Sequence, residues 1–323
     1  MTAPTGKPPL LVVVGPTASG KTAMAIHLAK CFSGEVVSGD AFQVYREMSI
    51  GTAKPSHEEM QEIPHHLIGI LSVAESYNMG RYLNDAKKVV GDVYSRGKLP
   101  IICGGTGLYI SSFIDGIQLS ETSSLPEYRE RLIAEAAKNG NAVLHKRLME
   151  VDPELAGTLH PNNVGRIIRA LEVFEATGRT QSEHHVRSKP PEPDFDICII
   201  GLTAYDRTFL YERINRRVDL MMEAGLLDEV RALESIGCSK AASQAIGYKE
   251  LLPYLYGKQD LSSCVESLKQ ATRRYAKRQL TWFRRDNRIH WFYIDHFAND
   301  VLQEQVARAV QSYPFLSLYN KCI

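Results

Sequence analysis

Hydrophobic residues in this chain gather in short continuous runs, and longer amphipathic stretches separate the runs. Runs of this kind indicate strands that are buried on both faces of a sheet. They span Leu10–Val14, Glu35–Ser38, Leu99–Cys103, Asp196–Leu202 and Ile289–Ile294. Between the first two runs, Thr22–Phe32 carries apolar side chains at helical spacing. Strands that alternate with helices predict an α/β fold in which helices flank a parallel sheet.

The alternation breaks between about Gln118 and Asp194. This stretch predicts three helices and no strand, and the helices span Pro126–Asn139, Ala142–Val151 and Asn163–Thr177. The prolines of Lys189–Pro193 predict a stiff connector, because consecutive prolines cannot join a helix or a central strand. We therefore expect an α/β core of residues 1–117 and 195–323 that is interrupted by an all-helical insertion domain of residues 118–194.

A glycine-rich stretch follows the first predicted strand and opens the first predicted helix. The residues Gly15, Pro16, Thr17, Ala18, Ser19, Gly20, Lys21 and Thr22 fit the pattern G-x-x-x-x-G-K-[ST] without a mismatch. Backbone N–H groups at a helix N-terminus favour an anion, Lys21 adds a positive charge, and Thr22 is placed to ligate Mg²⁺. The pattern predicts a P-loop NTPase-like core that binds a diphosphate or a triphosphate.

Two further features follow strands whose carboxyl ends share one edge of a parallel sheet. Asp40 follows Glu35–Ser38 directly, and a carboxylate there can take a proton from an incoming nucleophile. The strand Leu99–Cys103 ends in Gly104-Gly105-Thr106-Gly107, where a nucleotide-hydrolysing enzyme would carry an acid that holds the metal. The alternatives are a helix-cap or turn role for Asp40 and a tight structural turn at the glycines.

Basic residues are concentrated in two places. Residues 269–288 contain eight basic residues and one acid, and the basic ones are Lys269, Arg273, Arg274, Lys277, Arg278, Arg284, Arg285 and Arg288. At ~100° per residue, four of them share one helix face, which predicts contact with a phosphate backbone. Arg213 and Arg217 also share a helix face, and paired arginines can bind a diphosphate, although salt bridges to Glu212 and Asp219 are the alternative.

Composition narrows the class of protein. The chain has 323 residues, enough for about two domains, and 44% of them are hydrophobic. The 38 Lys and Arg against 37 Asp and Glu give a net charge of +1, which excludes a polycation but not a local basic face. The longest apolar run has about five residues where a membrane span needs ~20, and the six cysteines lack metal or redox spacing. We expect a cytoplasmic protein that does not bind membranes.

Taken together, these stretches resemble the tRNA dimethylallyltransferase (tRNA isopentenyltransferase) family. The resemblance extends to Ile50–Pro55, Pro64–Leu67, Arg166–Leu171, Ala245–Glu250 and Thr272–Arg284. Ile50–Pro55 and Lys277–Arg284 are far more specific than the phosphate loop, which many kinases share. The resemblance implies transfer of a dimethylallyl group from dimethylallyl diphosphate to N6 of the adenosine at tRNA position 37, 3′ to the anticodon, with release of diphosphate.

The resemblance also implies roles for individual residues. Asp40 would be the general base, Thr106 would lie at the reactive end of the donor, and Arg217 would clamp the diphosphate with Mg²⁺ as cofactor. The residues implied to contact the tRNA anticodon stem-loop are Asp40, Ala41, Phe42, Gln43, Gly165, Arg166, Ile167, Ile168, Arg169, Gln244, Gly247, Tyr248, Lys249, Lys277, Arg278, Gln279, Trp282 and Arg284. Many members have Ser where this chain has Ala41, so one hydroxyl contact to the flipped base is absent. We expect a monomer.

Other functions stay open at this point. A P-loop small-molecule kinase would hold ATP in the loop and use Asp40 on a hydroxyl group. A non-catalytic RNA-binding nucleotide switch would use the loop without chemistry. The missing acid after Leu99–Cys103 and the basic helix weigh against the kinase, and Asp40 beside the loop weighs against the switch.

Overall fold

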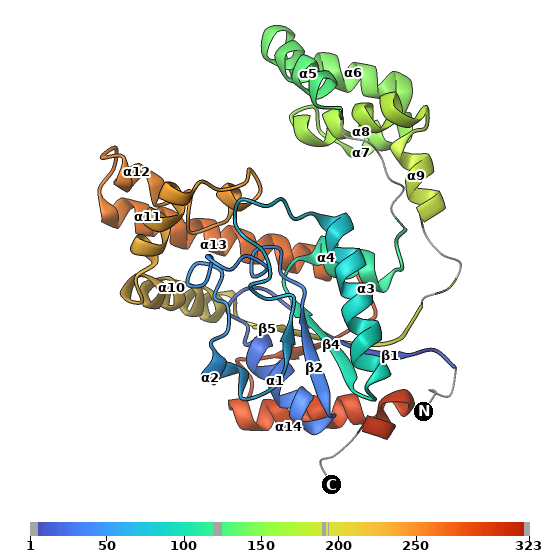
Figure 1. Ribbon diagram of the computed structural model, residues 1–323, viewed down its shortest axis with the longest axis vertical. Coiled ribbons are helices and arrows are strands. Elements are labelled where there is room, and N and C mark those ends of the chain that lie inside the picture. Colours follow the sequence, from blue (N-terminus) through green and yellow to red (C-terminus); the bar gives the residue numbers. More distant parts are fainter. Residues whose placement is uncertain (1–5, 119–124, 189–191, 193, 320–323) are drawn as a thin grey trace. The chain divides into compact units, whose positions relative to one another are not determined.

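The computed structural model describes residues 6–118, 125–188, 192 and 194–319 (Figure 1). Its sheet has six parallel strands in the order β3-β2-β4-β1-β5-β6. The strands are β1 (Pro9–Val14), β2 (Gly34–Ser38), β3 (His65–His66), β4 (Leu99–Gly104), β5 (Asp196–Thr203) and β6 (Ile289–Tyr293). The predicted fold class is confirmed. Only β3 was not predicted, because its two histidines form no hydrophobic run.

Both faces of the sheet are covered, which explains why its strands are continuously hydrophobic. Along β1, Leu10, Val12 and Val14 belong to one core, whereas Leu11 and Val13 belong to the other. Helices α3 (Met79–Ser95) and α4 (Gly107–Ile114) pack into the first core, and α1 (Lys21–Cys31) and α14 (Asn299–Gln311) into the second. Alternate side chains of each strand therefore anchor different helix layers.

Three more long helices complete this part of the chain. Along the chain, β5 is followed by α10 (Arg207–Glu223), then by α11 (Leu226–Ile236) and later by α13 (Leu261–Phe283). The short elements are α2 (His57–Met60), α12 (Leu252–Leu255) and the 3₁₀ turns Ala242–Gln244 and Pro314–Tyr319. No helix in the described ranges is long and apolar enough to cross a membrane.

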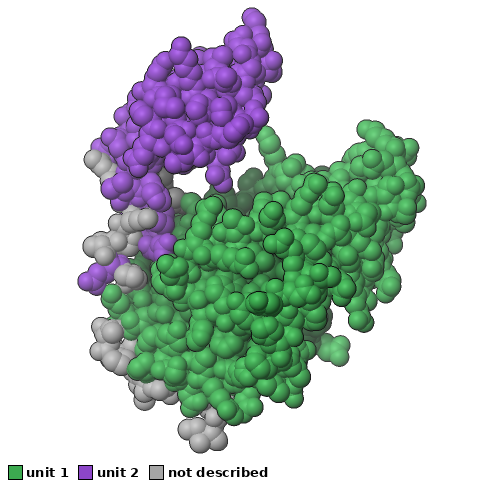
Figure 2. Space-filling model, turned by 180° about the vertical axis from the view of Figure 1, so that it is seen from behind, with its two compact units in different colours: residues 1–114, 194–323 green, residues 115–193 purple. Residues whose placement is uncertain are grey.

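Residues 115–193 form a compact unit of their own, distinct from the unit of residues 1–114 and 194–323 (Figure 2). Its helices are α5 (Pro126–Asn139), α6 (Asn141–Val151), α7 (Pro153–Thr158), α8 (Val164–Thr177) and α9 (Gln181–Ser188). Leu132, Leu144, Leu148, Ile167 and Leu171 form its core, each at most 1% exposed. The predicted connector Lys189–Pro193 lies outside the described residues except for Glu192.

Candidate active site

A cavity of about 1310 Å³ opens at the carboxyl ends of the strands in the sheet unit. The loops that follow β1, β2 and β4 line it, together with α10 and part of α13. Polar residues of its wall include Lys21, Thr22, Ser38, Asp40, Arg213, Arg216, Arg217 and Gln279. The parallel sheet therefore brings the predicted phosphate loop, Asp40 and both arginines of the second basic cluster to one site.

The phosphate loop has a backbone that depends on glycine. A Cβ on Gly15 would lie 2.2 Å from the carbonyl oxygen of Leu202, so β5 leaves no room for a side chain. Gly20 has φ 81° and forms the N-cap of α1, which turns the loop into the helix. The hydroxyl of Ser19 is buried and has no hydrogen-bond partner among the described residues.

Lys21 carries an ammonium group that is held in place but poorly solvated. Its Nζ donates to the carbonyl oxygen of Pro16 at 2.7 Å. The pKa of Lys21 is lowered to about 8, mainly by burial; the charge of Arg217 acts in the same direction, whereas Cys103 and Asp40 oppose the shift. Burial likewise lowers the pKa of Arg217. Two desolvated cations in one cavity create a strong requirement for an anion.

Asp40 is fixed by its own turn. Its Oδ1 accepts hydrogen bonds from the backbone N–H groups of Phe42 (2.9 Å) and Gln43 (3.4 Å). Within the described part of the chain, no hydrogen bond engages its Oδ2. One carboxylate oxygen thus orients the group, and the other is available for a proton.

The loop after β4 is locked against the loop that carries Asp40. The Oγ1 of Thr106 accepts from the N–H of Ala41 at 3.0 Å, and the N–H of Thr106 donates to the carbonyl of Gly39 at 3.2 Å. A Cβ on Gly104 would lie 2.3 Å from that same carbonyl oxygen. Gly104 and Gly105 form the cavity wall here, at the place where a metal-holding acid would otherwise stand.

The arginines of α10 face the cavity as their spacing predicts. The Nε of Arg213 donates to the carbonyl oxygen of Ala18 in the phosphate loop at 2.9 Å. Among the described residues no ion pair joins Arg213 or Arg217 to Glu212 or Asp219, which is the alternative the sequence left open, and Asp219 binds Lys269 of α13 at 2.6 Å. Arg213 therefore braces the loop, while Arg217 lines the cavity beside it.

Gln279 joins two loops of the site, a role that sequence reasoning missed. Its Oε1 accepts from the N–H of Thr17 at 2.9 Å, and its Nε2 donates to the carbonyl of Gly105 at 2.9 Å. The side chain is 5% exposed. Both ends of its amide are used inside the protein, at the wall of the cavity, and the implied tRNA contact of Gln279 stays a prediction.

The cationic face expected on α13 is corrected. Lys269 pairs with Asp219, and Arg273 pairs with Glu266 at 2.9 Å and donates to Asn215 at 2.6 Å. These partners neutralise the first half of the face. Lys277, Arg278 and Arg284 remain exposed, and none of them pairs with a carboxylate among the described residues. The free positive charge thus lies at the C-terminal end of α13.

Several other residues implied to contact tRNA are internal. Ile167 and Ile168 are 0% and 4% exposed, because the helical period turns both into the core of residues 115–193. Tyr248 is 5% exposed, and its hydroxyl donates to Glu229 at 2.7 Å. The expectation of a side-chain contact with tRNA is wrong for these three. The exposed members of the same stretches are Gly165, Arg166, Gln244 and Lys249.

Trp282, likewise implied to contact tRNA, packs against α4. Its Nε1 donates to the hydroxyl of Ser111 at 2.9 Å. A Cβ on Gly107 would lie 2.3 Å from the indole ring, so the ring needs glycine there. Trp282 remains partly exposed.

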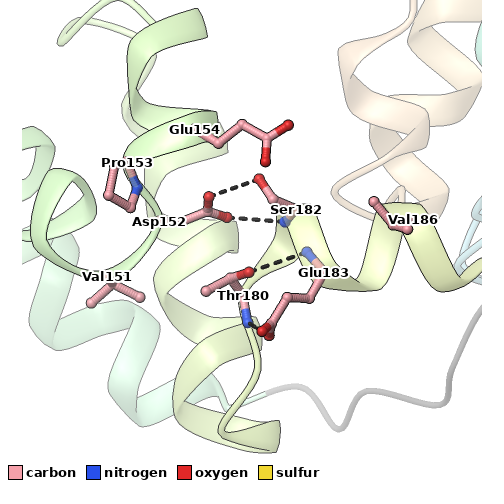
Figure 3. A pocket seen from close by; sticks show the side chains of 8 residues that line it. All are labelled: Val151, Asp152, Pro153, Glu154, Thr180, Ser182, Glu183 and Val186. Atoms are coloured by element: carbon pink, nitrogen blue, oxygen red, sulfur yellow. Dashed lines mark hydrogen bonds between the residues drawn. The ribbon is translucent and has the colours of Figure 1, made fainter.

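The helical unit has a cavity of its own, of about 380 Å³, shown in Figure 3. Asp152 accepts from the hydroxyl (2.7 Å) and the N–H (3.0 Å) of Ser182, and Glu183 accepts from the N–H of Thr180 at 2.9 Å. Asp152, the N-cap of α7, is thus hydrogen-bonded to α9, and Glu183 of α9 is hydrogen-bonded to the turn before that helix. An acidic lining of this kind does not suit a phosphate ligand, so the cavity at the sheet is the candidate site.

Comparison with known proteins gives consistent results. The chain matches the IPP transferase family over residues 43–286 and the isopentenyl transferase family over residues 8–75. It is 47% identical to the tRNA dimethylallyltransferases of Acetivibrio thermocellus, over 90% of this chain and 93% of that protein, and of Bacillus subtilis, over 88% and 91%.

Solved structures agree with this similarity. A tRNA isopentenylpyrophosphate transferase from Bacillus halodurans has a TM-score of 0.73 and 40% identity, covering 97% of this chain and 98% of its own. A eukaryotic dimethylallyltransferase acting on tRNA has a TM-score of 0.81 and 30% identity, covering 96% of this chain and 80% of its own.

The lowered pKa of Lys21 predicts how anion binding depends on pH. Because a diphosphate binds the protonated form, the dissociation constant of inorganic diphosphate should rise above about pH 8, by up to ~10-fold per pH unit. Titration calorimetry measures this. Lys21→Arg keeps its charge, so it should remove this rise while any titration of the ligand itself affects both proteins equally. A wild-type profile parallel to that of Lys21→Arg would contradict the assignment.

Proposed function

Because this chain belongs to the IPP transferase family, we propose that it transfers a dimethylallyl group from dimethylallyl diphosphate to N6 of the adenosine that follows the tRNA anticodon. The observation that carries the proposal is the convergence of Lys21, Arg217 and Asp40 on one cavity. The two cations suit a diphosphate leaving group, and the carboxylate suits proton removal from a nucleophile. A prenyl transfer to an amine needs both.

The donor would occupy the cavity with its diphosphate in the phosphate loop. Charge accumulates on the diphosphate as its bond to the allylic carbon breaks, and Lys21 and Arg217 stabilise this charge. The same cavity has an apolar wall for a five-carbon chain, formed by Phe42, Ile50, Val218, Met221, Ala245, Ile246 and Leu268. The lining thus provides for both halves of an allylic diphosphate.

Mg²⁺ fits this site as a companion of the diphosphate. The described residues contain no group of three or more His, Cys, Asp or Glu side chains that could hold a metal by themselves. Thr22 and Asp40 offer oxygen ligands in the same cavity, and Mg²⁺ is commonly held by few protein oxygens together with substrate phosphates. Thr22 would hold the ion, which when bound neutralises charge on the diphosphate oxygens.

Asp40 would act on the acceptor. The lone pair of the adenine amine is delocalised into the ring, so the amine is a weak nucleophile until a base removes its proton. The free Oδ2 of Asp40 is suited to that task, and Thr106 holds the adjacent backbone at Ala41. The adenosine must leave the stacked anticodon loop to reach this group, at a cost of a few kcal/mol.

The tRNA would bind through exposed cations of both units. Lys277, Arg278 and Arg284 offer positive charge at the end of α13, and Arg166 is exposed on α8 of the helical insertion. Such contacts supply affinity for phosphates without reading sequence. We propose that residues 118–194 serve as a tRNA-contacting domain. We also propose a cytoplasmic monomer.

A kinase is the competing proposal, and one experiment separates the two. The protein is incubated with tRNA, Mg²⁺ and either dimethylallyl diphosphate or ATP, and tRNA nucleosides are analysed by mass spectrometry. We expect a prenylated adenosine with the first donor and no ADP with the second, because glycines stand where a kinase holds its metal. Lys21→Ala and Arg217→Ala should weaken donor binding. Stoichiometric ADP formation coupled to phosphorylation of an acceptor would refute the transferase.

Asp40→Asn tests the general base. The amide keeps the shape of the side chain, and its Oδ1 can still accept from Phe42 and Gln43, so fold and donor affinity should stay unchanged. Loss of the base should lower the single-turnover transfer rate by ~10²–10⁴-fold. Rapid-quench measurement at saturating donor and tRNA checks this. A near-normal rate would remove Asp40 from the mechanism.

Salt dependence tests the tRNA-binding cations. Lys277→Ala and Arg284→Ala should each weaken tRNA binding and reduce the slope of log K against log [salt] by about one unit per lost phosphate contact. Lys269→Ala is the matched control on the same helix, because Asp219 already neutralises Lys269. Filter binding at several salt concentrations gives the slopes. Equal slopes for Lys277→Ala, Arg284→Ala and the control would contradict the proposed interface.

A further inference from the structure

Glu229, on α11, binds an unusual number of groups for one half-buried carboxylate. Its Oε2 accepts from the backbone N–H groups of Ser49 and Ile50, each at 2.8 Å. Its Oε1 accepts from the N–H of Gly51 at 3.0 Å and from the hydroxyl of Tyr248 at 2.7 Å. Three successive N–H groups that converge on one anion form a nest, and here a side chain of the protein fills it.

Tyr248 completes this contact from the other side. A Cβ on Gly51 would lie 2.7 Å from its hydroxyl oxygen, so the ring packs directly on the glycine backbone. Burial, together with the charge of Glu229, raises the pKa of Tyr248, so its hydroxyl stays protonated and donates. The stretches Ile50–Pro55 and Ala245–Glu250, both part of the family resemblance, thus meet at Glu229.

The loop held in this way supports the segment that carries Asp40. The carbonyls of Thr52 and Ala53 accept from the Nε2 of Gln43 at 3.3 and 3.2 Å. The Oε1 of Gln43 accepts from the hydroxyl of Ser38 at 3.0 Å, and the N–H of Gln43 donates to Asp40. Lys54 makes a second link between the two segments, because its Nζ donates hydrogen bonds to the carbonyl oxygens of Tyr45 (2.7 Å) and Arg46 (3.0 Å).

We propose that Glu229 is a positioning residue for the acceptor side of the reaction. It holds the segment Ser49–Lys54 and, through Gln43, the turn that carries Asp40. This rests on the proposed function, in which Asp40 is the base. The diphosphate side is separate, because Lys21 and Arg213 make their hydrogen bonds within the phosphate loop. Glu229 should therefore govern transfer without governing the affinity of the phosphate loop for a diphosphate.

Glu229→Gln tests this, since one end of the amide is a donor and cannot accept from backbone N–H groups. A small misplacement of a catalytic group is costly, so the single-turnover rate should fall by ~10–100-fold. The dissociation constant of inorganic diphosphate, which has no prenyl chain to contact the segment around Ile50, should stay within about twofold of the wild-type value. Glu234→Gln is the control, because Glu234 is on the same helix and also accepts a tyrosine hydroxyl, that of Tyr256. An unchanged rate, or a parallel loss of affinity for inorganic diphosphate, would overturn the proposal.

A second variant covers the case in which Glu229→Gln does not fold. Tyr248→Phe keeps the ring on Gly51 and removes one hydrogen bond to Glu229, so we expect a rate loss of about threefold to tenfold. A wild-type rate in this variant would count against the proposal.

Hydrogen exchange gives a readout that needs no substrate. In Glu229→Gln, or in Tyr248→Phe if the first variant does not fold, amides 40–43 should exchange faster together with amides 49–51, whereas residues 15–22 should keep their protection. Faster exchange at 49–51 alone would overturn the coupling to Asp40. A wild-type protein that fails to prenylate tRNA would overturn the proposed function, and the exchange result would still decide the coupling.

Discussion

The site depends on a close approach of backbone to backbone at the carboxyl edge of the sheet. Gly15 lies against the end of β5 and Gly104 lies against Gly39 after β2, at distances that leave no room for a Cβ. Four strand ends can therefore converge on a volume small enough for one anion. A single methyl group at Gly104 would separate the loop of Thr106 from the loop of Asp40 and break the hydrogen bond between Thr106 and Ala41.

The convergence of four strand ends on one small volume has an electrostatic consequence. Lys21 and Arg217 line one cavity, and burial lowers the pKa of each. A bound diphosphate would offset part of the free-energy cost of burying these two charges. The site is thus organised around a ligand charge before the ligand arrives, which is the condition under which electrostatic stabilisation of a leaving group is most effective.

Sequence reasoning succeeded where the determining contacts are local. A hydrophobic run with its flanking glycines predicted β1 and the phosphate loop, and the position of Asp40 after β2 placed it at the cavity.

Sequence reasoning failed where a hydrogen-bond or ion-pair partner comes from far along the chain. Gln279 binds Thr17 across 262 positions, and Glu229 binds Ser49 across 180. The acid that neutralises Lys269 lies on α10, so a face that is basic in sequence is partly neutral in the fold. No local pattern marks such pairs, and Ile167 and Ile168 show that a matched stretch also contains core positions.

The position of Gln279 within α13 constrains how many residues this helix can have before Gln279. Lys277 and Arg278 point outward, and the next residue points inward to hold Thr17 and Gly105. One residue inserted upstream would turn all of them by ~100°. The amide would then leave the two loops, and the exposed cations would move off their face at the same time. A substitution can alter the hydrogen bonds of Gln279 or the exposed cations separately. An insertion or deletion in α13 before Lys277 would displace both at once.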